Sequence, residues 1–212
     1  MEVAAQRPLL RGVSHAIASA AALCGAIVLY VLAGSPAEYV SAAVYSTSLV
    51  LLFATSATYH TLPWRPSLKR LLKRLDHSMI FLLIAGSYTP FCLLVLDGAL
   101  AAGILATIWA LAILGVFFRL AWIDAPTRWT VSSYLALGWL AVLAAPLIAI
   151  AVPLPASLAL AAGGTLYTAG ALIYAFRRPD PLPTVFGYHE VFHLLVIAAS
   201  GLHYAVVVSL FV

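Results

Sequence analysis

Hydrophobic and polar positions are segregated along this chain into long apolar runs and short polar connectors. A helix that crosses the hydrocarbon core of a bilayer, about 30 Å thick, needs about 20 apolar residues. Seven runs of this length predict transmembrane helices near 13–34, 39–60, 75–96, 99–122, 129–151, 155–176 and 188–211. We therefore expect an all-α membrane protein in which residues 1–212 form a single seven-helix domain.

The basic residues in the connectors predict how these helices are oriented. All 11 lysines and arginines fall on the same side of the expected membrane: Arg7, Arg11, Arg65, Lys69, Arg70, Lys73, Arg74, Arg119, Arg128, Arg177 and Arg178. Cytoplasmic loops carry such an excess of positive charge. We therefore expect a multi-pass protein of the plasma membrane with a cytoplasmic N-terminus and a C-terminus outside.

The composition supports the membrane assignment and excludes a nucleic-acid-binding role. The chain is 64% hydrophobic and only 8% charged, too apolar for a soluble domain of 212 residues. Its net charge of +4 comes from connector residues that set orientation, so we expect no nucleic-acid partner. Cys24 and Cys92 are isolated in apolar runs and form no metal-binding motif.

Histidines near one membrane face predict a metal site. His189 and His193 are four residues apart, on the same face of the last helix, and His60 ends the second helix at the same membrane face. Ionisable groups at membrane depth are costly, and shared coordination would satisfy all three imidazoles. Three protein ligands leave a fourth position for water, as in catalytic zinc sites. We expect Zn²⁺, because no redox ligand set is evident.

Two further residues at this face suit hydrolytic chemistry. Asp76 could orient or deprotonate a water whose pKa zinc lowers to about 7. Ser56, one turn from His60, could donate a hydrogen bond to a developing oxyanion. The natural target is the amide or ester bond of a lipid that enters from the membrane.

Simpler interpretations of the same residues stay open. A structural zinc could hold the second and last helices together without catalysis, Asp76 could pair with Arg74, and Ser56 could be a small packing residue. A transporter would spread ionisable groups through the membrane, yet only His203 lies deeper, about 15 Å further along its helix. The remaining histidines are expected to form hydrogen bonds between helices rather than to bind the metal: His15, His77 and His203.

Two other classes share parts of this pattern but are excluded. Glu190 completes an HExxH motif, and intramembrane zinc proteases combine that motif with a Leu-Asp-Gly sequence, present here at 96–98. Asp97 is expected at the opposite face, about 30 Å away, so Glu190 is expected beside the site instead. Retinal-binding proteins need a lysine within a helix, whereas Lys69 and Lys73 lie in a connector.

The three polar motifs, in this order and spacing, resemble the bacterial hemolysin III proteins. These belong to the progestin and adipoQ receptor family, which includes the adiponectin receptors. The resemblance covers nearly the whole chain and rests on Ser56-Ala-Thr-Tyr-His60, Leu75-Asp-His-Ser78 and Gly187-Tyr-His-Glu-Val-Phe-His193.

This resemblance implies zinc held by His60, His189 and His193, with Asp76 near the metal-bound water and Ser56 as the serine of the first motif. A wider superfamily with the same arrangement includes the alkaline ceramidases, which hydrolyse the amide of ceramide. The implied partners are membrane lipids, including a ceramide-like substrate. The alternative function is a non-enzymatic membrane sensor, receptor or cytolysin with a structural zinc.

Overall fold

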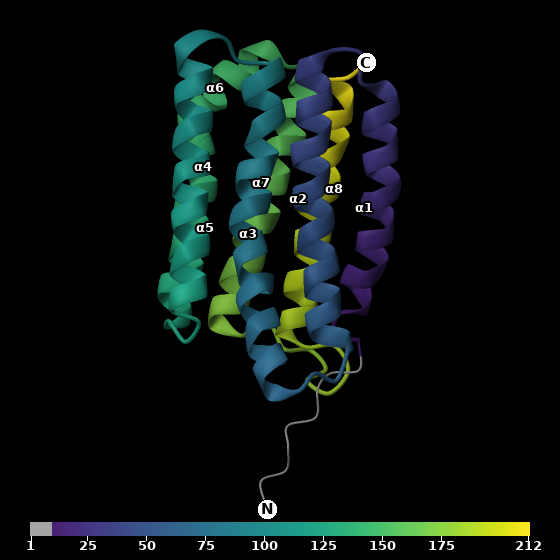
Figure 1. Cartoon of the computed structure of the whole chain (residues 1–212), viewed down its shortest axis with the longest axis vertical. Coiled ribbons are helices and arrows are strands. Elements are labelled where there is room, and N and C mark those ends of the chain that lie inside the picture. The colour runs from purple at the N-terminus through teal and green to yellow at the C-terminus, as the bar shows by residue number, and fades with distance from the viewer. Residues whose placement is uncertain (1–9) are drawn as a thin grey trace, which may run out of the picture.

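The computed structural model describes residues 10–212, which form a bundle of helices (Figure 1). Seven stretches are long and apolar enough to cross a membrane, and no strand occurs within the described range. The predicted class, an all-α membrane protein with seven spans, is confirmed. The helices are α1 (Val13–Leu32), α2 (Pro36–Thr61), α3 (Pro66–Leu94), α4 (Gly98–Ala121), α5 (Thr127–Trp139), α6 (Ala141–Ala151), α7 (Leu154–Phe176) and α8 (Tyr188–Ser209).

The fifth span consists of two helices, α5 and α6, because the α-helix is interrupted at Leu140. The N–H of Leu143 donates to the carbonyl of Leu140 at 3.0 Å, which is the tighter spacing of a 3₁₀ turn. Pro146 lies within α6 and has no N–H for the carbonyl one turn earlier. This span is therefore less regular than its continuous apolar run suggested.

The third span begins earlier than predicted, at Pro66 rather than near residue 75. Pro66 occupies the first turn, where proline is tolerated, and the basic residues after it are good helix formers. Only the part of this helix after the basic residues is apolar enough to suit a bilayer. Asp76 accordingly lies inside α3 instead of at its beginning.

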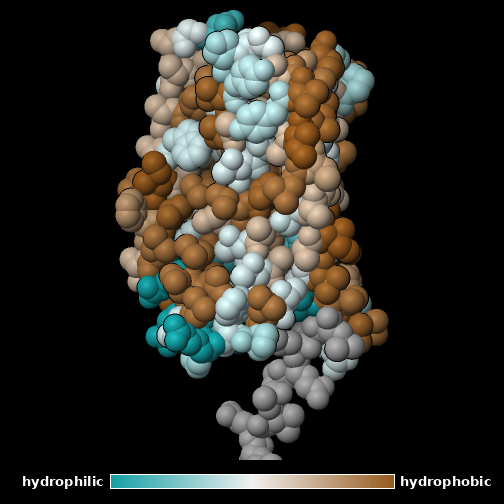
Figure 2. Space-filling model, turned by 45° about the vertical axis from the view of Figure 1, so that its right-hand side comes forward, coloured by the Kyte–Doolittle hydropathy of each residue, from teal (hydrophilic) through white to brown (hydrophobic). Residues whose placement is uncertain are grey.

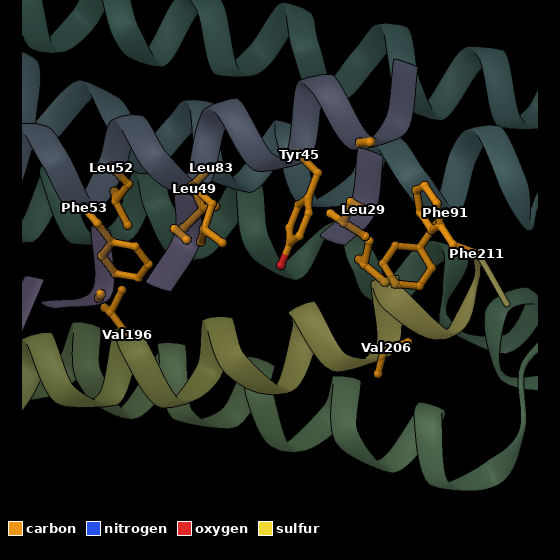
Figure 3. Close-up of a cluster of buried hydrophobic side chains, with 14 of the residues drawn as sticks. Leu29, Tyr45, Leu49, Leu52, Phe53, Leu83, Phe91, Val196, Val206 and Phe211 are labelled. Carbon is orange, nitrogen blue, oxygen red and sulfur yellow. The ribbon is translucent and has the colours of Figure 1, made fainter. Parts of the chain in front are cut away.

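The spans form a closed arrangement in which α8 returns to pack against α1 (Figure 1). Consecutive helices α1 to α4 pack side by side, α7 packs against α8, and α5 contacts α3, α4 and α7. A cluster of buried apolar side chains joins α1, α2, α3 and α8 (Figure 3). The start of α1 and the C-terminal end lie at opposite ends of the bundle (Figure 1).

The outer surface has the polarity that a bilayer requires. Apolar residues dominate the flank of the bundle seen in Figure 2, and strongly hydrophilic ones gather toward its lower end. Large apolar side chains point outward along the spans, including Ile17 at 68% and Ile150 at 85% exposure. Such exposure would be unfavourable in water and is normal against lipid.

Candidate metal site and its cavity

The three predicted histidine ligands converge where α2 ends and α8 begins. One potential ligand atom from each of His60, His189 and His193 lies within 4.8 Å of the others. The Nε2 atoms of His60 and His189 are 3.2 Å apart. Two nitrogens about 2.0–2.1 Å from a zinc ion in tetrahedral geometry are separated by about 3.3 Å. The donor set therefore fits a metal ion.

A fourth imidazole completes the packing of this site. The ring of His15 on α1 stacks on His193, with centroids 3.7 Å apart and planes 10° from parallel. Within residues 10–212, neither nitrogen of the His15 side chain nor Nδ1 of His193 has a hydrogen-bond partner, and all three atoms are buried. Buried imidazole nitrogens without partners are costly, which is a further reason to expect a ligand here. The sequence pattern puts His15 near this face, but no local pattern connects it to His193.

Gly12 brings the beginning of α1 close to the site. It has a φ of +86°, in the left-handed region, and a Cβ at this position would lie 2.8 Å from the Cβ of His60. Only glycine combines this backbone conformation with so close an approach. The start of α1 is thereby held against the end of α2, three residues before His15.

Asp76 and Ser56 are brought to the same site from α3 and α2. The carboxylate Oδ2 of Asp76 is 3.8 Å from Nε2 of His60, and the Ser56 hydroxyl lies within hydrogen-bonding reach of Asp76. Ser56 is 3% exposed. All five residues selected from the sequence thus meet in one place, although they come from three helices.

A cavity of about 550 Å³ extends from this site into the bundle. Most of its lining is apolar and comes from α2, α3 and α5 to α8. Its polar residues include Ser56, Asp76, His77, His189 and His193 at the histidine end, and it reaches His203 further along α8. The arrangement can place an apolar ligand of considerable length with one end beside the histidines.

The carboxylate of Glu190 makes its contacts at the junction of α1 and α8 and not at the candidate metal site. Arg11 Nε donates to Glu190 Oε1 at 2.5 Å, and Oε2 accepts from the backbone N–H of Gly187 at 2.8 Å. Asp97 precedes α4 at the turn from α3, at the opposite end of the bundle from the start of α8 (Figure 1). These positions agree with the exclusion of the intramembrane protease arrangement.

The structure also shows a role for Arg119 that the sequence pattern does not predict. The charge pattern places it at the end of the fourth helix, beside the connection to the fifth, where basic residues mark the membrane face; the structure shows that it is 1% exposed and hydrogen-bonds to His77 on α3. His203 likewise makes the expected contact with another helix, since its Nε2 lies 3.2 Å from the carbonyl of Leu160 on α7. Burial of Arg119 depends on how α3, α4 and α5 pack, which no local pattern reports.

Comparisons with known proteins identify relatives over most of the chain. The family model described as haemolysin-III related matches residues 3–204. The chain is 33% identical over 203 residues to Hemolysin-3 of Bacillus cereus, covering 92% of this chain and 87% of that protein. It is 32% identical over 174 residues to the Hemolysin-3 homolog of Bacillus subtilis (strain 168), covering 79% and 76%.

A human protein is also similar. The monocyte to macrophage differentiation factor of Homo sapiens is 27% identical over 195 residues, which cover 90% of this chain and 79% of that protein. The seven spans and the histidine site thus occur in a sequence that matches one family over nearly its full length. This chain belongs to the haemolysin III family of membrane proteins.

Proposed function

We propose that this protein is a zinc-dependent membrane hydrolase that cleaves the amide bond of a ceramide-like lipid. The observation that carries the proposal is the cluster of His60, His189 and His193, with Asp76 beside it, at one end of a long apolar cavity. Imidazole nitrogens suit zinc, and an apolar cavity suits the acyl chain of a lipid.

The chain's own residues would divide the chemistry among them. His60, His189 and His193 hold the metal, which when bound supplies Lewis-acid activation of water at neutral pH. Asp76 accepts the proton of the attacking water and returns it to the leaving amine. Ser56 donates a hydrogen bond near the developing negative charge, and its hydroxyl also reaches Asp76.

The proposal includes the site's place in the cell. The basic residues expected on the cytoplasmic side lie in the first turns of α3 and after α7, at the same end of the bundle as the histidines. The metal site would then lie near the cytoplasmic face of the plasma membrane. A lipid substrate would reach it from within the bilayer and would extend along the cavity.

One observation favours a second function without catalysis. The three histidines come from α2 and α8, so a metal ion would join two spans that are distant in sequence. A zinc with this structural role would suit a membrane sensor or cytolysin. It predicts that metal removal lowers stability while no lipid is turned over with or without the metal.

The first experiment measures zinc content and lipid hydrolysis in the same preparations. Detergent-purified protein is compared with His193→Ala for zinc per chain and for release of fatty acid from ceramide. About one zinc per chain and turnover, both lost in the variant, support the hydrolase. Zinc without turnover of any lipid tested favours the structural role, and a well-folded protein without metal contradicts both.

A further inference from the structure

A buried arginine lies at the end of α4 without any carboxylate partner among residues 10–212. The guanidinium of Arg119 donates to the hydroxyl of Thr130 at 2.9 Å and to the carbonyls of Trp122 and Ile123 at 3.2 and 3.0 Å. Its remaining bond is to Nδ1 of His77 at 2.8 Å. A charge enclosed in a membrane bundle is costly and by default marks a functional element.

The bond to Arg119 determines which nitrogen of His77 carries the proton. A guanidinium has only donors, so Nδ1 of His77 must be the acceptor. The imidazole is then neutral, with its proton on Nε2. The hydroxyl of Tyr134 donates to the backbone carbonyl of His77 at 3.0 Å, so α5 also holds this residue in place.

The Nε2–H group of His77 is left available at the histidine end of the cavity. His77 is among the lining residues, and Nε2 has no hydrogen-bond partner in the described part of the chain. Tyr174 is in edge contact with the rings of both His77 and His189, with centroids 6.5 and 5.5 Å away. The unused donor is therefore one ring away from a proposed metal ligand.

The other candidate hydrogen-bond donor at this end of the cavity is Ser56, which already has an acceptor nearby. Ser56 has a single O–H, and the carboxylate of Asp76 lies within its reach. A carbonyl oxygen that gains negative charge in an apolar cavity needs a preorganised donor. The imidazole N–H of His77 provides one, because Arg119 and Tyr134 position it before any ligand enters.

We propose that His77, held by Arg119 in its Nε2–H form, donates a hydrogen bond to the acyl carbonyl oxygen of a lipid bound in the cavity. The inference rests on the proposed function in taking an acyl lipid as the ligand. It adds a residue that touches the substrate, and a donor of this kind contributes about 10²–10³-fold to turnover in other enzymes.

The test reads this hydrogen bond directly with palmitamide labelled with ¹³C at the carbonyl. The infrared carbonyl band of the bound probe is compared in wild type, His77→Phe and His77→Gln, each also combined with His193→Ala. A glutamine at this position keeps an acceptor for Arg119 and an N–H for the ligand, whereas a phenylalanine keeps neither. We expect the band at lower frequency in wild type and His77→Gln than in His77→Phe, with or without His193.

The outcomes separate this inference from the proposed function. A band shift that persists in a protein without zinc or turnover supports the role of His77 and contradicts the hydrolase. Zinc and turnover with the same band in wild type and His77→Phe contradict the role of His77 alone. Failure of palmitamide to bind wild type also overturns the inference.

A measurement on wild type covers the case in which His77→Phe does not fold. Protein labelled with ¹⁵N in its histidines is compared with His77→Gln to assign the signals of His77. We expect a protonated Nε2 and an unprotonated Nδ1. A proton on Nδ1 would be incompatible with the bond to Arg119 and would overturn the inference.

Discussion

Asp76 is the residue whose position best separates catalysis from simple metal binding. Its carboxylate lies 3.8 Å from Nε2 of His60 but is not part of the group of three ligand atoms. Asp76 comes from α3, whereas the three histidines come from α2 and α8. A carboxylate in this place can move a proton without being needed to hold the ion. Its removal should therefore separate the two properties.

We predict that Asp76→Ala retains about one zinc per chain and loses lipid hydrolysis by roughly 10²–10⁴-fold, the usual contribution of a general base. The measurement pairs metal analysis with a ceramide hydrolysis assay on the same sample. Turnover equal to wild type in a zinc-loaded variant would show that Asp76 does not handle the proton.

Glu190 is the residue for which a catalytic role must be distinguished from a role in stability. Its carboxylate pairs with Arg11, at the junction of α1 and α8, while its backbone lies next to His189. Sequence motifs would give it the role of catalytic base, whereas its contacts give it a role in stability.

We predict that Glu190→Gln lowers stability by ~1–3 kcal/mol, because the carboxylate charge that pairs with Arg11 is lost, and keeps most of the turnover. Glu38→Gln is the matched control, since Glu38 caps α2 in the same way without a cation partner among residues 10–212. Thermal unfolding in detergent provides the measurement. A loss of turnover with unchanged unfolding temperature would instead favour a catalytic role for Glu190.

At the scale of the helices, the start of α1 packs closely against the end of α2 beside the candidate site. Gly12 allows this approach, and His15 then stacks on His193. Any side chain at position 12 would push α1 away from His60.

We predict that Gly12→Ala weakens zinc binding and lowers stability more than Gly98→Ala does. Both glycines have positive φ, so both substitutions carry a strain of roughly 1–2 kcal/mol, but a Cβ at Gly98 would meet no atom within 4 Å. Zinc titration and thermal unfolding of both variants measure the difference. Equal effects would mean that the contact of α1 with His60 does not matter.

At the scale of the whole molecule, the cavity determines what can reach the histidines. Its lining comes mostly from α2, α3 and α5 to α8, so no single helix encloses it. Gly164 on α7 lines it, and a Cβ there would meet nothing within 4 Å. A large side chain at this position would enter space that the proposed substrate needs.

We predict that Gly164→Phe reduces lipid hydrolysis at least tenfold by raising KM, while zinc content stays near one per chain. Gly103→Phe is the control, because Gly103 is equally open but exposed on α4 and absent from the cavity lining. Kinetics of both variants on the same ceramide provide the measurement. Unchanged kinetics in Gly164→Phe would place the substrate outside this cavity.

The sequence by itself determined the class of the fold and predicted the residues of the candidate site. Apolar runs long enough to cross a bilayer report transmembrane helices directly, because membrane thickness sets their length. The spacing of His189 and His193 follows from helix geometry, and His60 and Asp76 could be assigned to the same face by counting spans. The early start of α3 was not predicted because its first turns are basic and lie outside the apolar run. The interruption at Leu140 was not predicted because it does not change how apolar the run is.

Only the tertiary structure decided which side chains meet. The stacking of His15 on His193, the pairing of Arg11 with Glu190 and the bond between Arg119 and His77 each join residues at least 42 positions apart. A hydrophobicity pattern gives each helix its depth and leaves its rotation and neighbours open. These depend on close packing of all the spans, and they alone turned scattered histidines into a site beside a cavity.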